Sequence, residues 1–448
     1  MVGALKQRGR AEPALTDAER TPSAMDCRAF YGPRRLLALF GLSMLALVGI
    51  WQFVAALQMG VVLPRDFAQD YLAAESAIAG RSPYHNQNDR LDDLFEAADP
   101  TSGPHYSNHP PPSLIFFVPL TLLPYSVAFG VWGLIQLFCL WMIVIVITRA
   151  LSRSLSWLTT LAITAGLIVC WPIRENFVEG QLNIPLAVGI TTCWYGMRAG
   201  RPVLGGVALA TSFALKPLAS LIILWAVWRK KWKLVGTAAV GFTIYGFIGV
   251  YLAGIDGVRD YFTTAYPFHA ALWPGYPDNA SIQGFGTRLF GPSSWRPRPL
   301  YDLPVLTRVF TISGWIVTVA LLFWRLSQSR FLLERLDREF VAVSIASLLL
   351  IPVIWPHYYV LLSAPVVILG TYFVNRRSWI QLTLLVISLL VLCLPREFAQ
   401  IDAAPRLLRT MGAVQFPALL TLYGLALASL SPSSYPTLTE HLDQSHEV

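Results

Sequence analysis

The stretch LLALFGLSMLALVGIWQFVAAL at residues 36–57 is followed, after a short spacer, by DFAQDYLAAESAIAGRSPY at residues 66–84. The first stretch is uncharged over 22 residues, enough for a helix to cross a bilayer core of roughly 30 Å. The second stretch carries Asp66 and Asp70 one helical turn apart. Because charge at a membrane edge is costly and often functional, we expect a transmembrane helix followed by a functional element.

The composition extends this interpretation to the whole chain. Of its 448 residues, 55% are hydrophobic and 13% are charged, and the mean hydropathy is +0.52. A soluble domain carries about a quarter charged residues, so the sequence predicts an all-α polytopic membrane protein that contacts membrane lipids. The net charge of +8 lies mainly in short loops and termini, where it orients a membrane protein. Without a basic domain, no nucleic-acid partner is expected.

Apolar runs predict about twelve transmembrane helices with both termini in the cytoplasm. The predicted parts are a disordered cytoplasmic tail at 1–35, a membrane domain at 36–430 and a cytoplasmic tail at 431–448. External loops at about 58–112 and 255–303 are expected to carry short interfacial helices. After the first span, the others are expected within 113–148, where Pro119 and Pro124 separate two, and at 155–171, 182–197, 203–228, 234–254, 304–324, 340–355, 358–374, 379–394 and 411–430.

The basic residues agree with this topology in all but one place. The Arg34-Arg35 pair precedes the first span and predicts a cytoplasmic N-terminus. Residues 197–201 are also basic, yet strict alternation of spans places them outside. A broken or half-spanning helix around Lys216-Pro217 would remove the conflict, and the sequence leaves this open.

The stretch after the first span has the signals of a short helix. Asp66 is a plausible N-cap with Gln69 at the third helical position, as in a capping box, and Gly80 suits a helix end. Apolar residues recur at helical spacing, at Phe67, Tyr71, Ala74 and Ile78. We expect an amphipathic helix on the outer membrane surface.

The first two candidates for chemistry are Asp66, with Asp70 beside it, and His357; Lys216 is the third. Asp66 can act as a general base or only as a helix cap. Asp70 can orient a substrate hydroxyl, raise the proton affinity of Asp66, or simply face solvated headgroups. His357, within WPHYY at 355–359, can donate to a phosphate or exchange protons, or belong to an interfacial aromatic belt.

Other polar residues lie where a substrate could reach them. Lys216 interrupts an apolar run and needs an anionic partner, a polar cavity or a path to the interface. Gln181 and Asn183 lie at a helix end, where they can bind substrate or satisfy the backbone. Asn279 and Arg288 in the second external loop offer donors suited to a sugar or phosphate; Asn279 also matches a three-residue glycosylation sequon.

Cysteines and histidines give no sign of a metal site. Four cysteines lie in apolar runs and one in the N-terminal tail, at Cys139, Cys170, Cys193, Cys393 and Cys27. They are interpreted as small buried apolar residues, and a disulfide scaffold or zinc site is not expected. No nucleotide-binding or nucleophile motif occurs either.

Taken in order, a set of short motifs resembles glycosyltransferase family 87. These are GT-C membrane enzymes related to polyprenol-phosphate-mannose-dependent α-1,2-mannosyltransferases. The matching segments are Asp66-Phe67, Tyr71, Ala73-Ala74, Gly80-Arg-Ser-Pro-Tyr84, His109-Pro-Pro-Pro112, Pro119-Leu-Thr-Leu-Leu-Pro124, Gly180-Gln-Leu-Asn183, Leu215-Lys-Pro217, Asn279 to Gly284, and Pro356-His-Tyr358. The chain departs from the family at His109, usually tyrosine, and at Asp70, where an aromatic residue is common.

The resemblance implies a GT-C bundle that inverts the sugar's anomeric centre at the outer leaflet of the plasma membrane, facing the periplasm or exterior. It implies a hexose, with mannose first, moving from a polyprenyl-phosphate donor to a lipid-linked or glycan acceptor, with Asp66 as general base. Tyr71, Tyr84 and His109 then join the substrate-binding candidates. Because the leaving group is a lipid phosphate monoester, with no diphosphate to neutralise, no metal or other cofactor is expected.

A transporter or flippase of lipid-linked saccharides is the alternative. Transporters place charge near the membrane midplane on broken helices, and Lys216-Pro217 is the one feature that fits this. The external loops and span ends hold the carboxylates and histidines instead, which favours an enzyme.

Overall fold

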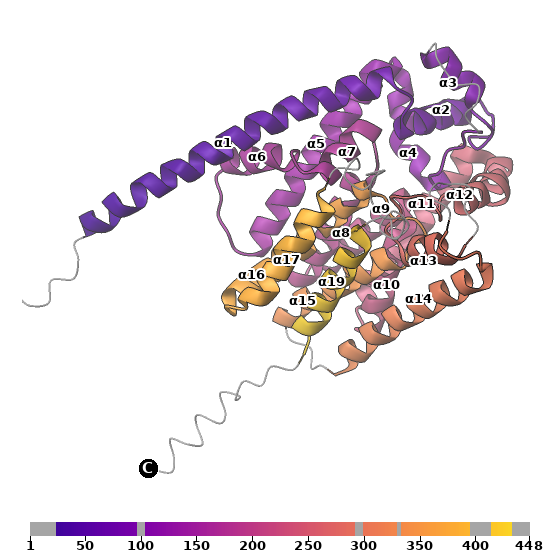
Figure 1. The fold of residues 1–448 in the computed structure, drawn as a ribbon. Coiled ribbons are helices and arrows are strands. Elements are labelled where there is room, and N and C mark those ends of the chain that lie inside the picture. Colours follow the sequence, from indigo (N-terminus) through magenta and orange to yellow (C-terminus); the bar gives the residue numbers. More distant parts are fainter. Residues whose placement is uncertain (1–23, 96–103, 292–298, 329–332, 395–413, 432–448) are drawn as a thin grey trace, which may run out of the picture.

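The computed structural model describes residues 24–95, 104–291, 299–328, 333–394 and 414–431. Every regular element in these ranges is helical, so the all-α prediction is confirmed (Figure 1). Most of the predicted tails at 1–35 and 431–448 lies outside the described residues. The first helix, α1, already begins at Ala24, within the predicted N-terminal tail.

Five helical segments are long and apolar enough to cross a membrane, and a bent pair is a sixth. The five lie in α1 (Ala24–Val62), α5 (Tyr125–Ala150), α11 (Trp232–Asp260) continued by η4 (Tyr261–Ala265) and α12 (Tyr266–Leu272), α14 (Pro304–Ser327), and η5 (Pro356–Leu362) continued by α16 (Ser363–Asn375). The chain is therefore a multi-pass membrane protein. The count of about twelve spans stays a prediction.

Shorter helices complete the described part of the chain. They are α2 (Asp66–Ile78), α3 (Asn88–Phe95), η1 (Pro111–Ser113), α4 (Leu114–Phe117), η2 (Val118–Leu122), α6 (Trp157–Leu167), α7 (Trp171–Glu179), α8 (Asn183–Arg198), α9 (Pro202–Leu215), η3 (Pro217–Ala219), α10 (Ser220–Trp228), α13 (Ile282–Phe290), α15 (Leu333–Leu349), α17 (Trp379–Leu392) and α19 (Gln415–Ser429). The segment 111–122 together with α9, α17 and α19 is apolar but shorter than a full span.

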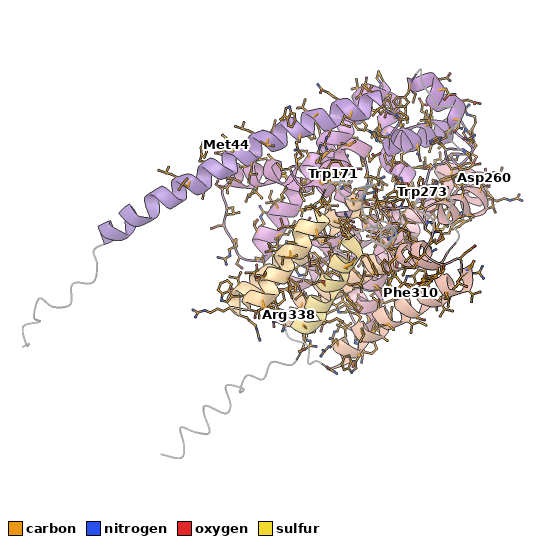
Figure 2. The ribbon with its side chains drawn as sticks, viewed as in Figure 1. Met44, Trp171, Asp260, Trp273, Phe310 and Arg338 are labelled. Atoms are coloured by element: carbon orange, nitrogen blue, oxygen red, sulfur yellow. The ribbon has the colours of Figure 1, made fainter. Side chains whose placement is uncertain are left out.

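The long helices surround a core of broken and short ones. In Figure 1, α1 lies along one edge and α14 along the opposite edge, with α2 and α3 beyond the C-terminal end of α1. Large apolar side chains on the outer helices are exposed, among them Trp51, Tyr251 and Ile316. Figure 2 likewise shows Met44 projecting from α1, whereas Trp273 lies among the inner helices. Such outward apolar surface is what contact with lipid tails requires.

Two predicted boundaries differ from the observed ones. The span expected at 155–171 is bent by 82° between α6 and α7, because Pro172 begins a new helix in the first turn of α7. The second external loop, expected from residue 255, begins as helix. Gly254 has a left-handed φ of 69°, which kinks α11 there, but the helix continues to Asp260.

Lys216 lies at a break between two helices that return to the same end of the molecule. Its backbone is extended, with φ −152° and ψ 132°, between the end of α9 and η3. The turns before α9 and after α10 line one pocket that includes Gly200, Lys230 and Lys233. Both basic turns therefore lie close together, as the break at Lys216 allows, and the side of the membrane on which they lie stays a prediction.

Candidate active site

Helix α2 is held in the interior by its first aromatic side chain. Phe67 is fully buried, and its ring centroid lies 5.3 Å from that of Phe129 and 5.9 Å from that of Phe117. Of the 13 residues in α2, eight are buried, including Asp70. The expectation of a helix lying on the membrane surface is therefore wrong, because small residues such as Ala73 and Ala74 let other elements pack around it.

A glycine brings the end of α7 against α2. Gly180 has a φ of 65°, and a Cβ added there would lie 2.5 Å from the Phe67 Cβ. The Trp132 indole donates to the Gly180 carbonyl at 2.8 Å. Since only glycine tolerates both the left-handed backbone and the close approach, this position lets Gln181 reach Asp66.

Asp66 begins α2 but does not cap it. The N-cap residue is Arg65, which makes no side-chain capping bond and instead pairs with Glu179 at 3.0 Å. A carboxylate oxygen of Asp66 accepts a hydrogen bond from the Gln181 amide. The N-cap interpretation is corrected: the side chain is aimed across the site, toward a residue 115 positions later in the sequence.

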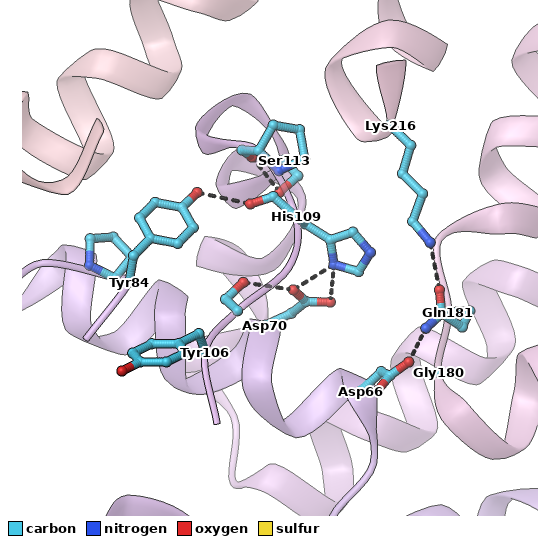
Figure 3. Close-up of polar contacts among 12 residues, drawn as sticks. Asp66, Asp70, Tyr84, Tyr106, His109, Ser113, Gly180, Gln181 and Lys216 are labelled. Carbon is cyan, nitrogen blue, oxygen red and sulfur yellow. Dashed lines mark hydrogen bonds and ion pairs between the residues drawn. The ribbon is translucent and has the colours of Figure 1, made fainter. Parts of the chain in front are cut away.

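Lys216 lies on the other side of the same amide. Its Nζ donates to Gln181 Oε1 at 2.7 Å and to Asn183 Oδ1 at 3.1 Å, and it lies 4.7 Å from the centroid of the Tyr358 ring. Two hydrogen bonds therefore link Asp66 to Gln181 and Gln181 to Lys216 (Figure 3). These neutral partners leave the ammonium able to accept an anion.

Asp70 orients His109. His109 Nδ1 lies 2.7 Å and 2.9 Å from the two Asp70 oxygens, and the Ser107 hydroxyl donates to Asp70 at 3.3 Å. Tyr84 donates its hydroxyl to the His109 carbonyl at 2.9 Å. Both carboxylate and imidazole are buried. Nδ1 is thus engaged by the carboxylate, and the ring edge bearing Nε2 is turned toward Lys216 in Figure 3.

Three cavities meet at these residues. A small one of about 70 Å³ is lined by Asp66, Asp70, His109, Gln181 and Lys216. A second, of about 550 Å³, is largely apolar and also includes His109 and Lys216. A third, of about 260 Å³, contains Asp66 with two further carboxylates and several aromatic rings. Trp273 and Trp355 line all three. The aspartate is thus reachable from two chemically different sides.

The charges around Asp66 tune its basicity. Burial raises the pKa of the Asp66 carboxyl above its ordinary value, and the charge of Asp70 adds to the rise. Positive charge on His109 and Lys216 and the hydrogen bond from Gln181 act in the opposite direction. A carboxylate with a raised pKa accepts a proton more readily once ionised. Asp66 is therefore suited to act as a base.

The structure gathers most of the predicted residues but not all of them. His357 is buried beside Trp355 and lines the 260 Å³ cavity together with Asp66. Tyr71 points elsewhere, donating its hydroxyl to the Leu123 carbonyl at 2.8 Å. Tyr84 supports the site from outside the cavities: its hydroxyl donates to the His109 carbonyl, and its ring centroid lies 5.0 Å from that of Tyr261, which lines the 550 Å³ cavity.

Asn279 and Arg288 hold the second loop together. The Asn279 amide donates to the Pro352 carbonyl at 3.1 Å and accepts from the Ile354 N–H at 2.9 Å. Arg288 donates to the carbonyls of Tyr276 and Asn279 at 3.0 and 2.7 Å. Because Asn279 is fully buried, its amide is closed to glycosylation in the folded chain. Both side chains fix backbone next to the cavities.

Sequence reasoning missed several lining residues. Glu175 lines the 260 Å³ cavity; its spacing of four from Glu179, which the sequence places with Gln181 and Asn183 at a helix end, was a usable signal of a shared polar face. His269 lines the other two cavities, and Trp273 lines all three. Nothing local marks these two, since their position depends on α12 folding back over the site.

Comparison with known proteins identifies the family. The family model for glycosyltransferase family 87 matches residues 108–356, more than half of the chain. The chain belongs to glycosyltransferase family 87. This family-87 chain is therefore a membrane glycosyltransferase, which decides between the enzyme and transporter classes. The match begins after Asp66, so the fold, and not the family match, brings that residue to the site.

Two curated relatives are similar to this glycosyltransferase over part of its length. One is a polyprenol-phosphate-mannose-dependent alpha-(1-2)-phosphatidylinositol pentamannoside mannosyltransferase from Mycolicibacterium smegmatis, 27% identical over 292 residues, covering 62% of this chain and 66% of the relative. The other has the same name in Mycobacterium tuberculosis, with 23% identity over 257 residues and coverage of 56% and 55%. The chain thus spans somewhat less than two thirds of either relative. No solved structure matches it.

Within the described residues, no three His, Cys, Asp or Glu side chains are grouped to hold a metal ion. The expectation of a reaction without metal or other cofactor stays a prediction.

Proposed function

We propose that this chain transfers a hexose, with mannose as the first candidate, from a polyprenyl-phosphate donor to a hydroxyl of a lipid-linked or glycan acceptor, with inversion at the anomeric carbon. The observation that carries the proposal is the position of Asp66. It lies on an acidic, aromatic cavity and is linked through one amide to the lysine of an apolar cavity.

The apolar cavity suits the donor. Its volume of about 550 Å³ is bounded by side chains such as Leu221, Leu224 and Ile351, and Lys216 and His109 also line it. A polyprenyl tail matches the apolar lining, and a phosphate matches the ammonium and an imidazole N–H. The names of the two relatives, which include polyprenol-phosphate-mannose dependence, support the same donor class.

The acidic cavity suits an uncharged sugar of the acceptor. Glu175 and Glu179 can accept hydrogen bonds from sugar hydroxyls, and the rings of Trp273 and Tyr276 offer apolar faces to a pyranose. Its carboxylates would repel a phosphate at this position. The two cavities therefore separate an anionic donor headgroup from a hydroxyl-bearing acceptor.

The reaction follows from this separation. Asp66 takes the proton of the acceptor hydroxyl while the acceptor oxygen bonds to the anomeric carbon of the sugar. The bond between that carbon and the phosphate oxygen breaks at the same time. The products are the glycosylated acceptor and polyprenyl phosphate. Lys216 and His109 stabilise the charge that grows on the leaving phosphate. His357 contacts the acceptor side, and Gln181 and Asn183 position the lysine.

The same proposal includes an external active site in the plasma membrane. Asp66 and the Arg34-Arg35 pair lie at opposite ends of the membrane-crossing part of α1. If basic flanks stay in the cytoplasm, the site faces the periplasm or exterior. The GT-C bundle with about twelve spans is part of this proposal.

Replacing Asp66 with asparagine tests the base directly. Membranes supplied with labelled polyprenyl-phosphate mannose and acceptor glycolipids should lose transfer by roughly 10²–10⁴-fold, the range for removing a general base. Asp93→Asn, on exposed α3, is the matched control and should leave transfer unchanged. His357→Ala should lower transfer less than Asp66→Asn does. Full turnover by Asp66→Asn at normal protein level would refute the assignment.

A further inference from the structure

Two cysteines that are distant in the sequence lie in contact. The Sγ atoms of Cys170 and Cys393 are 2.6 Å apart, although the residues are separated by 223 positions. Cys170 is the N-cap of α7, directly after the 82° bend, and Cys393 follows the last residue of α17. Both are partly exposed and line an apolar cavity of about 370 Å³ between α5, α6, α7, η5, α16 and α17.

Each cysteine follows a helix that has a basic turn at its other end: Cys170 comes after α6, and Cys393 comes after α17. Arg149 and Arg153 precede α6, and Arg376 and Arg377 precede α17. With these turns in the cytoplasm, both helices run outward and carry the two thiols toward the external side. Thiols persist in the reducing cytoplasm but are oxidised outside it. The placement depends on the orientation proposed above.

We propose that Cys170 and Cys393 form an intramolecular disulfide in the mature protein. A disulfide of an exported dithiol oxidant is the co-reactant. One thiolate attacks it to give a mixed disulfide, and the second thiolate displaces the oxidant. The chain loses two protons and two electrons and gains one S–S bond, and the oxidant is reduced to two thiols.

The disulfide would join the C-terminal end of α17 to the N-terminal end of α7, the helix that leads to Gln181. It closes a loop from residue 170 to residue 393, which contains Gln181, Lys216 and His357 of the site. At its N-terminal end, α7 carries the cysteine; at its C-terminal end it leads into Gly180 and Gln181. Opening the bond would free one end of that helix from α17. The disulfide is thus a covalent brace for the element that positions Gln181.

Thiol counting on the full chain in cell membranes tests the proposal. The membranes are denatured in excess N-ethylmaleimide, which blocks every free thiol, including the buried Cys193. The chain is then reduced with dithiothreitol, and newly released thiols are tagged with polyethylene glycol-maleimide. Of the five cysteines, two should be tagged after reduction and none without it. Cys170→Ser and Cys393→Ser should each abolish tagging, while Cys139→Ser, the matched control, should retain two tags.

Absence of tags in the unaltered chain would overturn the proposal. A second sample, oxidised with diamide, then shows which part failed. If diamide produces two protected thiols, the contact is right and the external orientation is wrong; if it does not, the contact itself is wrong. Persistence of two tags in Cys170→Ser would show pairing elsewhere and would also overturn it. None of these outcomes depends on transferase activity, so the test is independent of the proposed reaction.

Discussion

Replacing Lys216 with glutamine should move the acid limb of the pH–activity profile to higher pH. Lys216 and Asp66 contact opposite ends of the Gln181 amide, and the lysine charge lowers the pKa of Asp66. Removing that charge takes away stabilisation of the ionised carboxylate, so the pKa of Asp66 rises further. At a given acidic pH, a smaller fraction of the enzyme then holds Asp66 ready to accept a proton.

The size of the shift follows from the geometry. Nζ lies 2.7 Å from Gln181 Oε1, and the amide group and its bond to Asp66 add the rest of the separation. For two unit charges roughly 7 Å apart at an effective dielectric constant of about 20, the attraction is about 2 kcal/mol. That corresponds to between one and two pKa units. Water in the adjoining cavities reduces it, so we expect a shift of about one pH unit.

The assay is kcat/KM for transfer from labelled polyprenyl-phosphate mannose across the pH range in which the enzyme is stable. Lys216→Arg keeps the charge and should leave the acid limb in place, even if the rate falls. Lys233→Gln, at an exposed lysine in the first turn of α11, controls for a general loss of charge. An acid limb at the same pH in Lys216→Gln and the unaltered enzyme would refute the coupling between this lysine and Asp66.

Three further results are expected. Gly180→Ala should lower the free energy of unfolding by about 1–3 kcal/mol through overpacking and reduce transfer. Gly80→Ala is the control, because Gly80 also has a positive φ but an added Cβ there meets nothing within 4 Å, so its loss should be smaller. Equal losses in the two variants would contradict the packing argument. Asp70→Asn should shift the acid limb to lower pH, opposite to Lys216→Gln, because the charge of Asp70 raises the pKa of Asp66. His357→Ala should raise the KM for acceptor more than that for donor, as competition assays with each substrate would show.

Much of the site could be predicted from sequence because charged residues within or beside apolar spans carry a large desolvation penalty. A lysine within an apolar run and carboxylates beside a membrane span require compensation, and Asp66, Gln181 and Lys216 do lie together. Roles were harder to predict than positions. Asp70 and His109 form a pair 39 residues apart, and Asn279 supports backbone, which depends on contacts that no local pattern records.

The broken helix at Lys216 shows where sequence reasoning stopped. Proline at 217 and the basic turn at 197–201 made a break plausible, but a straight span was equally consistent with the apolar run at 203–228. The structure decides through packing: the turns before α9 and after α10 meet in one pocket, which a single span could not allow.

The sequence by itself determined that the chain folds in a membrane and which charged side chains need polar or charged partners. Both follow from the free energy of transferring apolar runs and isolated charges out of water, which depends on local sequence. Only the tertiary structure decided which groups compensate each other. Gly180 must approach Phe67 before Gln181 can join Asp66 to Lys216, and the two cysteines meet across 223 residues. Such contacts arise from close packing of distant segments, for which spacing along the chain carries no signal.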